Sequence, residues 1–204
     1  MTEFFEIDNE YETSVRLRQA SLDTGTTCRR IIADSFEHLL LIPTKSIPAI
    51  ITDPPYDFNQ SEKDFIHGEF LRICSGIVIV FAPPENQWIL PADQYLFWIK
   101  PISTKNTVKS YSRFVEMMFV YGRHRWHFDR HWSAYTNVFT DLVDDTSTHP
   151  FRKPPSLVER LILNHTSPGD TILDPFAGSG VVGEVASRLG RNSILIDKVT
   201  VYGK

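Results

Sequence analysis

The chain has 204 residues, of which 42% are hydrophobic and 23% are charged, with a formal net charge of −4. This length suits one domain with a full-sized core, and no apolar run approaches the roughly 20 residues that a membrane-spanning helix needs. The acidic start MTEFFEIDNEYE is unlike a secretory signal peptide, and Cys28 and Cys74 lack CxxC spacing, so we expect free thiols in a reducing cytoplasm.

The negative total conceals an uneven distribution of charge. The first twelve residues contain five acids and no Lys or Arg. Between Lys100 and His131 there are seven Lys or Arg residues and two acids, Glu116 and Asp129. A basic central segment is typical of nucleic-acid binding, so the net charge does not exclude that class of function.

Short apolar runs alternate with helix-like stretches along the chain. Strands are predicted at 30–34, 48–53, 76–82, 95–100, 114–122, 170–174 and 192–197. Helices are predicted at 61–73, 155–166 and 180–190, with Gly190 well placed to end the last one. This alternation favours an α/β fold, a doubly wound and mostly parallel seven-stranded sheet with helices on both faces.

Four acids stand at the ends of predicted strands, namely Asp34, Asp53, Asp174 and Asp197. In doubly wound sheets, ligands bind outside the carboxyl ends of the strands. One acid in such a place is ordinary, but four predict a binding site along this edge.

The stretch DPFAGSG (174–180) follows a predicted strand and opens a predicted helix. Glycines let the backbone approach a ligand, but the loop fits neither the GxGxxG pattern nor a P-loop. Asp174 would repel phosphate and attract an ammonium group, and Asp197 could accept hydrogen bonds from ribose hydroxyls. S-adenosylmethionine has both an ammonium group and ribose hydroxyls. The alternative is a tight turn that binds no ligand.

The stretch IITDPPYDFN (50–59) ends an apolar strand in an acid, two prolines and an aromatic ring. The prolines fix φ and so hold the acid in place. A proline-stiffened turn without chemistry is the alternative interpretation of these residues.

Together the two motifs resemble the amino-methylating DNA methyltransferases that modify adenine N6 or cytosine N4. The DPPY motif at 53–56 precedes DPFAGSG by 121 positions, the order of the beta class. HPFRKPPSLVERLI (149–162) resembles the H-P-x-x-K-P segment that precedes the cofactor strand in that family. IIADSFEHL (31–39) resembles the segment whose acid faces the adenine of the cofactor, and 111–123 resembles the strand pair beyond the catalytic motif. The resemblance covers roughly residues 28 to 198.

The resemblance implies a Rossmann-like methyltransferase sheet, S-adenosylmethionine as cofactor and direct methyl transfer to a flipped base. It implies the catalytic residues Asp53, Pro54, Pro55 and Tyr56. It implies the cofactor-binding residues Asp34, Lys153, Pro154, Asp174, Pro175, Phe176, Ala177, Gly178, Ser179, Gly180 and Asp197. The Asp53 carboxylate and the Pro54 carbonyl would accept hydrogen bonds from the N–H groups of the amine. Tyr56 would stack on the extruded base.

The run YGRHRWHFDRHW (121–132) has no clean period, and we interpret it as an excursion from the sheet. It favours DNA contact over a folded cap with solvated charges. The predicted DNA-binding residues are Lys105, Lys109, Arg123, Arg125, Trp126, Arg130 and Trp132. The spacing of His124, His127 and His131 has no fourth ligand nearby, and methyl transfer needs no metal, so none is expected.

The predicted organisation is an N-terminal arm (1–27), a catalytic half (28–121), a short target-recognition insertion (122–148) and a cofactor-binding half (149–204). The expected function is adenine-N6 methylation of DNA, because Asp at the first motif position is mostly an adenine feature in the family. Alternatives are cytosine-N4 methylation, adenine methylation of RNA, and a non-catalytic DNA-binding protein. We expect a cytoplasmic protein of a bacterium or phage-infected cell, with no membrane contact. The short recognition segment favours a homodimer, and the remaining chain leaves no room for a nuclease domain.

Overall fold

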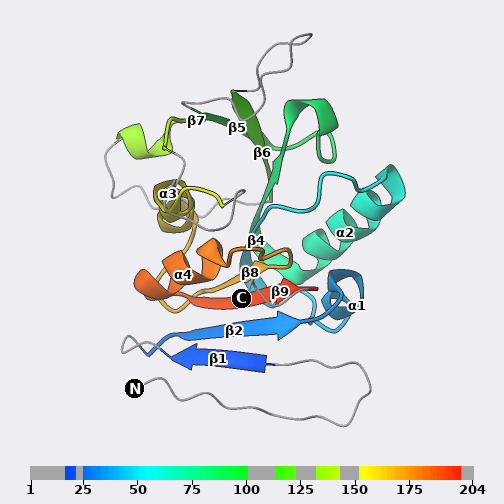
Figure 1. The fold of residues 1–204 in the computed structure, drawn as a ribbon, viewed down its shortest axis with the longest axis vertical. Helices are drawn as coiled ribbons and strands as arrows, with labels where there is room; N and C mark the ends of the chain where they lie inside the picture. The colour runs from blue at the N-terminus through cyan, green and yellow to red at the C-terminus, as the bar shows by residue number, and fades with distance from the viewer. Residues whose placement is uncertain (1–16, 22–24, 101–113, 123–131, 143–151, 199–204) are drawn as a thin grey trace, which may run out of the picture.

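The computed structural model describes residues 17–21, 25–100, 114–122, 132–142 and 152–198. Within these ranges, one nine-stranded sheet carries helices against both faces (Figure 1). The strands are β1 (Leu17–Ser21), β2 (Thr27–Ile32), β3 (Ile47–Thr52), β4 (Cys74–Ala82), β5 (Gln94–Ile99), β6 (Val115–Gly122), β7 (Val138–Phe139), β8 (Thr171–Asp174) and β9 (Asn192–Asp197). The helices are α1 (Ser35–Leu39), α2 (Gln60–Ile73), α3 (Pro155–His165) and α4 (Val181–Arg188), with short 3-10 helices η1 (Pro84–Asn86) and η2 (Trp132–Tyr135).

The strand order is β1-β2-β9-β8-β3-β4-β6-β5-β7. Strands β2, β9, β8, β3 and β4 are parallel to one another, whereas β1 and β6 pair antiparallel with their neighbours. From β3 the chain proceeds through α2 to β4, and from β8 it proceeds through α4 to β9 on the opposite side. The adjacent strands β3 and β8 therefore flank a topological switch point, the place where doubly wound sheets bind ligands.

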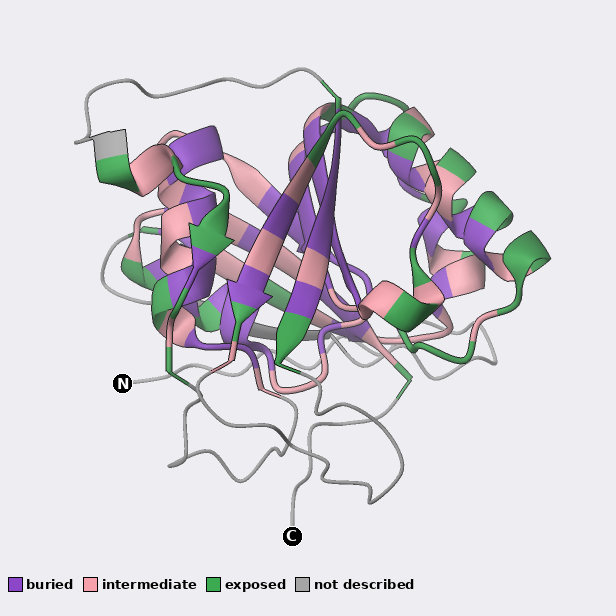
Figure 2. Ribbon diagram, turned by 90° about the horizontal axis from the view of Figure 1, so that it is seen from above, coloured by how far each residue is buried: buried purple, intermediate pink, exposed green. Residues whose placement is uncertain are grey.

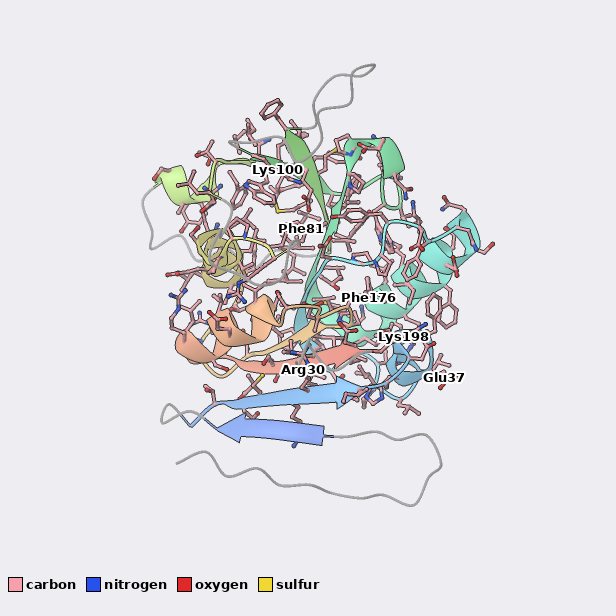
Figure 3. The ribbon with its side chains drawn as sticks, in the orientation of Figure 1. Arg30, Glu37, Phe81, Lys100, Phe176 and Lys198 are labelled. Atoms are coloured by element: carbon pink, nitrogen blue, oxygen red, sulfur yellow. The ribbon has the colours of Figure 1, made fainter. Side chains whose placement is uncertain are left out.

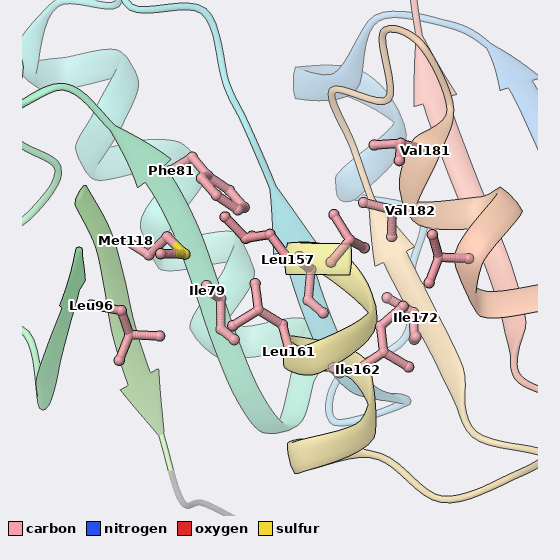
Figure 4. Close-up of a cluster of buried hydrophobic side chains, with 14 of the residues drawn as sticks. Ile79, Phe81, Leu96, Met118, Leu157, Leu161, Ile162, Ile172, Val181 and Val182 are labelled. Atoms are coloured by element: carbon pink, nitrogen blue, oxygen red, sulfur yellow. The ribbon is translucent and has the colours of Figure 1, made fainter. Parts of the chain in front are cut away.

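The central strands bury both of their faces, and alternate residues serve different cores. Ile51, Ile79 and Phe81 pack with α3 and α4, as Figure 4 shows for the latter two side chains. Ile50 and Val80 point to the other face, where they pack in the core beneath α1 and α2. This two-residue alternation explains why the sequences of β3 and β4 are largely continuous apolar runs, and Figure 2 shows that buried residues are concentrated in the strands at the middle of the molecule.

Helix α2 begins shortly after the DPPY motif, and its start has a local cause. The Asn59 side chain accepts a hydrogen bond from the Glu62 backbone N–H at 3.1 Å, and Glu62 accepts from the Asn59 N–H at 2.8 Å. This reciprocal capping box satisfies two N–H groups that the first helical turn would otherwise leave unpaired. The motif is thus held between a buried strand and a well-capped helix.

The predicted α/β sheet with helices on both faces is confirmed. Each of the seven predicted strands and three predicted helices coincides with an observed element, with ends that differ by up to three residues. Within the described residues, no helix combines the length and apolar character needed to cross a membrane.

The predicted number of seven strands is wrong, because the described residues form nine. β1 pairs antiparallel with β2, so part of the predicted N-terminal arm belongs to the sheet. β7 pairs with β5, and Phe139 is buried in the core, so the range of the predicted target-recognition insertion (122–148) includes a strand of the sheet. The five-residue helix α1 was not predicted either. These elements are too short, or too polar, to produce a periodic signal.

Candidate active site at the carboxyl ends of β3 and β8

The two motifs of the sequence meet at the switch point of the sheet. β3 ends at Thr52, directly before Asp53, and the adjacent β8 ends at Asp174. The Thr52 hydroxyl donates a hydrogen bond of 2.8 Å to the Asp174 carboxylate, and both residues are buried. The DPPY motif and the glycine loop are therefore parts of one site, joined through a buried side-chain contact.

The DPPY turn presents a carboxylate and an aromatic ring. Tyr56 is 42% exposed, and its hydroxyl donates to Oδ1 of Asp53 at 2.9 Å. The Tyr56 backbone carbonyl accepts a hydrogen bond from the Asn86 amide. The ammonium of Lys63, on α2, donates to the same Asn86 side chain and to the Gln87 carbonyl at 2.9 Å. The turn is thus anchored through its backbone while the ring keeps a face open for contact.

Behind the turn lies a cluster of alternating charges, drawn from four separate parts of the chain. Nζ of Lys153 lies 2.6 Å from Oδ2 of Asp53 and 2.5 Å from Oε1 of Glu116. The other oxygen of Glu116 lies 2.7 Å from Nζ of Lys100. Nζ of Lys153 also lies 5.2 Å from the centre of the Phe81 ring. Figure 3 shows Lys100 and Phe81 in the same part of the molecule.

The charges in this cluster shift one another's pKa values. Burial works to lower the pKa of Lys153, but the carboxylates of Asp53 and Glu116 outweigh it and raise that pKa, so the amine stays protonated. Burial works to raise the pKa of Glu116, but Lys153 and Lys100 outweigh it and lower that pKa. Burial raises the pKa of Asp53, opposed by Lys153 and supported by Glu116. Asp53 is thus a carboxyl whose pKa burial and Glu116 raise and Lys153 lowers.

The glycine loop is held by hydrogen bonds from neighbouring strands. The Gly178 N–H donates to the Asp197 carboxylate at 2.6 Å, and its carbonyl accepts from the Arg30 guanidinium on β2 at 2.7 Å. The Ser35 hydroxyl donates to the Pro175 carbonyl. Gly180, at φ +78°, forms the N-cap of α4, a left-handed conformation that favours glycine. Figure 3 shows Arg30 and Phe176 in this region of the molecule.

The four predicted acids follow four consecutive strands of the sheet. Asp34 follows β2, Asp197 ends β9, Asp174 ends β8 and Asp53 follows β3, and those strands are neighbours in that order. Asp34 caps α1 by accepting from the Phe36 N–H at 2.8 Å and pairs with Lys198 at 3.0 Å. The expected row of carboxylates along one edge is therefore present.

Asp174 is the buried acid of this row. Burial raises its pKa to about 7, against the hydrogen bonds that it accepts from the Thr52 hydroxyl and the Phe176 N–H, and the nearby charges of Asp53 and Asp197 add to the rise. A carboxyl in this state gains greatly from a cationic ligand, because a positive charge offsets the cost of burying the ionised form. The site thus suits a ligand with an ammonium group beside the glycine loop.

The remaining predicted cofactor-, DNA- and metal-binding residues lie partly within and partly outside the described residues. Lys153, predicted to bind cofactor, directs its ammonium to Asp53 and Glu116, while the adjacent Pro154 is buried at the start of α3. The predicted DNA-binding residues that lie outside the described residues are Lys105, Lys109, Arg123, Arg125, Trp126 and Arg130, as are the three histidines His124, His127 and His131. Trp132 begins η2. Among the described residues, no group of three or more His, Cys, Asp or Glu side chains is arranged to hold a metal.

Sequence reasoning missed four charged residues that shape the site. Glu116 left a readable signal, since it is an acid inside the apolar run VEMMFVYG. Lys100, Lys63 and Arg30 left none, because a single cation at a strand end, on a helix or in a strand is ordinary in a sequence.

Comparison with known proteins gives one family match. Residues 92–203 match the model of the family described as DNA methylase. The chain is 57% identical over 72 residues to the type II methyltransferase M2.DpnII of Streptococcus pneumoniae. This match covers 35% of the present chain and 27% of M2.DpnII. It is 46% identical over 63 residues to the DNA adenine methyltransferase YhdJ of Escherichia coli, covering 31% and 21% respectively. The matches therefore span about a quarter of the length of these relatives.

Solved structures match over a larger share of the chain. The M1.HpyAVI–SAM complex is 25% identical, with a TM-score of 0.67, and the match covers 85% of this chain and 94% of that one. The cytosine-N4-specific PvuII DNA methyltransferase is 17% identical, with a TM-score of 0.69, over 84% and 82% of the two chains. At that identity the second match establishes the fold alone.

Proposed function

Because the chain belongs to the amino-methylating DNA methylase family, we propose that it transfers a methyl group from S-adenosylmethionine to the exocyclic N6 of adenine in DNA. The observation that carries this proposal is the buried hydrogen bond between Thr52 and Asp174, which places the DPPY turn beside the glycine loop. Direct transfer requires the site that binds the target amine to lie next to the site that binds the methyl donor. The two motifs lie next to each other in this way.

The glycine-loop side fits S-adenosylmethionine by the chemistry of its groups. Asp174, with its raised pKa, would take the ammonium of the methionine part. Asp197 and Asp34 are carboxylates on adjacent strands, suited to accept hydrogen bonds from ribose hydroxyls or from the adenine amine. When bound there, the cofactor would supply an electrophilic methyl group.

The DPPY side would prepare the adenine. An exocyclic amine is a weak nucleophile, because its lone pair is delocalised into the ring. Hydrogen bonds from its N–H groups to the Asp53 carboxylate and, by the family resemblance, to the Pro54 carbonyl would localise that lone pair toward the methyl group. Since the prolines fix the acceptors beforehand, little reorganisation would accompany the reaction.

The exposed ring of Tyr56 suits a flipped base. Extrusion from a duplex costs a few kcal/mol, and base–aromatic stacking contributes roughly 1–3 kcal/mol, which would offset much of that cost. We assign DNA contact to the basic segment that contains Arg123, Arg125 and Arg130, and we propose a homodimer as the means of widening this contact. The cytoplasm is the compartment in which such a substrate would be met.

The test is transfer of labelled methyl groups from S-adenosylmethionine to duplex DNA, single-stranded DNA and RNA by the purified full chain. We expect incorporation into DNA, and we expect Asp53→Ala to abolish it while cofactor binding, measured by calorimetry, survives. Labelling of RNA but not of DNA would overturn the substrate, and unchanged turnover by Asp53→Ala would overturn the role of that residue.

A further inference from the structure

The charge cluster behind the DPPY turn has no assigned part in the chemistry above. Its central pair is deeply buried, since the Lys153 and Glu116 side chains are 8% and 4% exposed. Burying ions is costly unless each is paired and hydrogen-bonded. Because this cluster contacts the Asp53 carboxylate, its geometry indicates how it can act on that group.

The hydrogen bonds of Lys153 account for its entire ammonium group. An ammonium has three N–H donors. The three acceptors around Nζ are Oδ2 of Asp53 at 2.6 Å, Oε1 of Glu116 at 2.5 Å and the Tyr56 hydroxyl at 3.3 Å. The side chain is therefore held between two elements, with Glu116 on β6 and Asp53 after β3.

Glu116 is in turn oriented from its far side. Its second oxygen binds Lys100, which follows β5 and also approaches the Trp98 ring to 5.0 Å. β5 and β6 pair in register, with Trp98 opposite Glu116. The series of contacts from Lys100 through Glu116 to Lys153 thus begins at the paired strands β5 and β6 and ends at Asp53.

The two oxygens of Asp53 are consequently different. Oδ2 is bound to Lys153, deep in the cluster, whereas Oδ1 accepts from the Tyr56 hydroxyl. Tyr56 is 42% exposed, whereas the Lys153 side chain is 8% exposed. Oδ1 is then the oxygen that an incoming N–H donor can reach.

We propose that Lys153, oriented by Glu116 and Lys100, is a positioning residue that keeps Asp53 ionised and directs its Oδ1 to the target amine. The identity of that amine rests on the proposed function, but the control of Asp53 by Lys153 does not. This role differs from the cofactor contact expected for Lys153 from the sequence.

The proposal predicts shifts of opposite sign in the ionisation of Asp53. The charged or titratable groups facing it are Lys153 from the segment before α3, Glu116 from β6, Asp174 from β8 and Tyr56 from its own turn. Removing the cation by Lys153→Met should raise the pKa of Asp53 by about 1–3 units, the usual effect of an adjacent opposite charge. Removing the anion by Glu116→Gln should lower it, since a like charge disfavours ionisation.

The experiment follows the Asp53 carboxyl by NMR in the full chain labelled at the aspartate carboxyl carbon, with the signal identified by its loss in Asp53→Asn. We expect an upward shift of its midpoint in Lys153→Met, a downward shift in Glu116→Gln and none in Arg188→Gln. The last is a matched control, because it removes the cation from an exposed pair with Glu159, between helices α4 and α3 and outside the cluster. Midpoints that do not move, or that move in the same direction in both cluster variants, would overturn the proposal.

Kinetics and cofactor binding supply the second readout. The acid limb of the methyl-transfer rate should follow the NMR midpoint in each variant, with the dissociation constant for S-adenosylmethionine unchanged. A weakened cofactor with an unmoved Asp53 midpoint would instead make Lys153 a cofactor ligand. If the wild-type chain transfers no methyl group at all, the proposed function fails, but the NMR shifts still decide the role of Lys153.

A second variant guards against misfolding of Lys153→Met. Lys100 is more exposed than Lys153, with 19% of its side chain accessible, so Lys100→Met leaves the inner contacts in place. It should raise the Asp53 midpoint in the same direction as Lys153→Met and by less, because the lost charge acts from beyond Glu116. A shift downward would contradict the arrangement.

Discussion

Replacing Asp174 with asparagine should make the ligand-free protein more stable at alkaline pH. The Asp174 carboxyl is 4% exposed and its pKa is raised to about 7 by burial. A carboxyl whose pKa is higher in the folded than in the unfolded chain releases its proton on unfolding. Stability is then greatest below the unfolded value, and it falls as the pH rises toward the folded value.

The size of the effect follows from the difference in pKa. The ordinary value for Asp174 is 3.8 and the folded value is about 7. Each unit is worth about 1.4 kcal/mol, so the folded protein should lose about 4 kcal/mol in all through this group as the pH rises from well below 3.8 to well above 7. Between pH 5 and pH 8 the loss should be about 3 kcal/mol. Asparagine has the same shape, can still accept from Thr52 and does not ionise.

The assay is urea denaturation of the wild type and of Asp174→Asn at pH 5 and at pH 8. Comparing the two proteins cancels the other titrating groups. We expect the variant to gain about 3 kcal/mol relative to the wild type on going from pH 5 to pH 8, and to bind S-adenosylmethionine more weakly. A difference between the two proteins that is the same at both pH values would refute the claim that Asp174 is a destabilising buried acid.

Three further predictions concern the turn and its surroundings. Tyr56→Ala should weaken binding of the flipped base by roughly 1–3 kcal/mol, measured as a higher KM for DNA. Tyr56→Phe keeps the ring and should retain most of that binding. Equal losses in both variants would contradict the stacking role of Tyr56. Asn86→Ala removes the amide that donates to the Tyr56 carbonyl. It should lower kcat without changing the cofactor dissociation constant. A change confined to cofactor binding would contradict the role of Asn86 in anchoring the DPPY turn. Arg160→Met removes the guanidinium that lies 3.4 Å from the Phe139 ring and that bonds to the Thr136 and Val138 carbonyls; hydrogen exchange at 132–142 should rise while that of β3 stays unchanged.

Much of the fold could be predicted from the sequence because its central strands are buried on both faces. β4 is buried at every position from Ile77 to Ala82, so both of its faces must be apolar there, and the sequence shows a continuous apolar run. The same reasoning placed Asp53 and Asp174 at strand ends, and parallel pairing of β3 with β8 brings such ends together. The two motifs could therefore be assigned to one site before any contact was known.

The rest could not be predicted because it depends on pairing between distant segments. Glu116 reaches Lys153 because β6 pairs antiparallel with β4, and no local pattern specifies that neighbour or its register. The two-residue strand β7 has too few residues for a period, and its place beside β5 follows from packing of Phe139 in the core. Short elements and charge clusters are thus decided by tertiary structure rather than by local preference.

The central claim is that the joined motifs form a centre for methylation of adenine N6. The most direct measurement is mass spectrometry of the nucleosides released from unmethylated duplex DNA after incubation with the full chain and S-adenosylmethionine, with Asp53→Ala in parallel. We expect N6-methyldeoxyadenosine in the wild-type reaction and none with the variant. N4-methyldeoxycytidine as the product, or no methylated nucleoside from a folded protein that binds the cofactor, would contradict it.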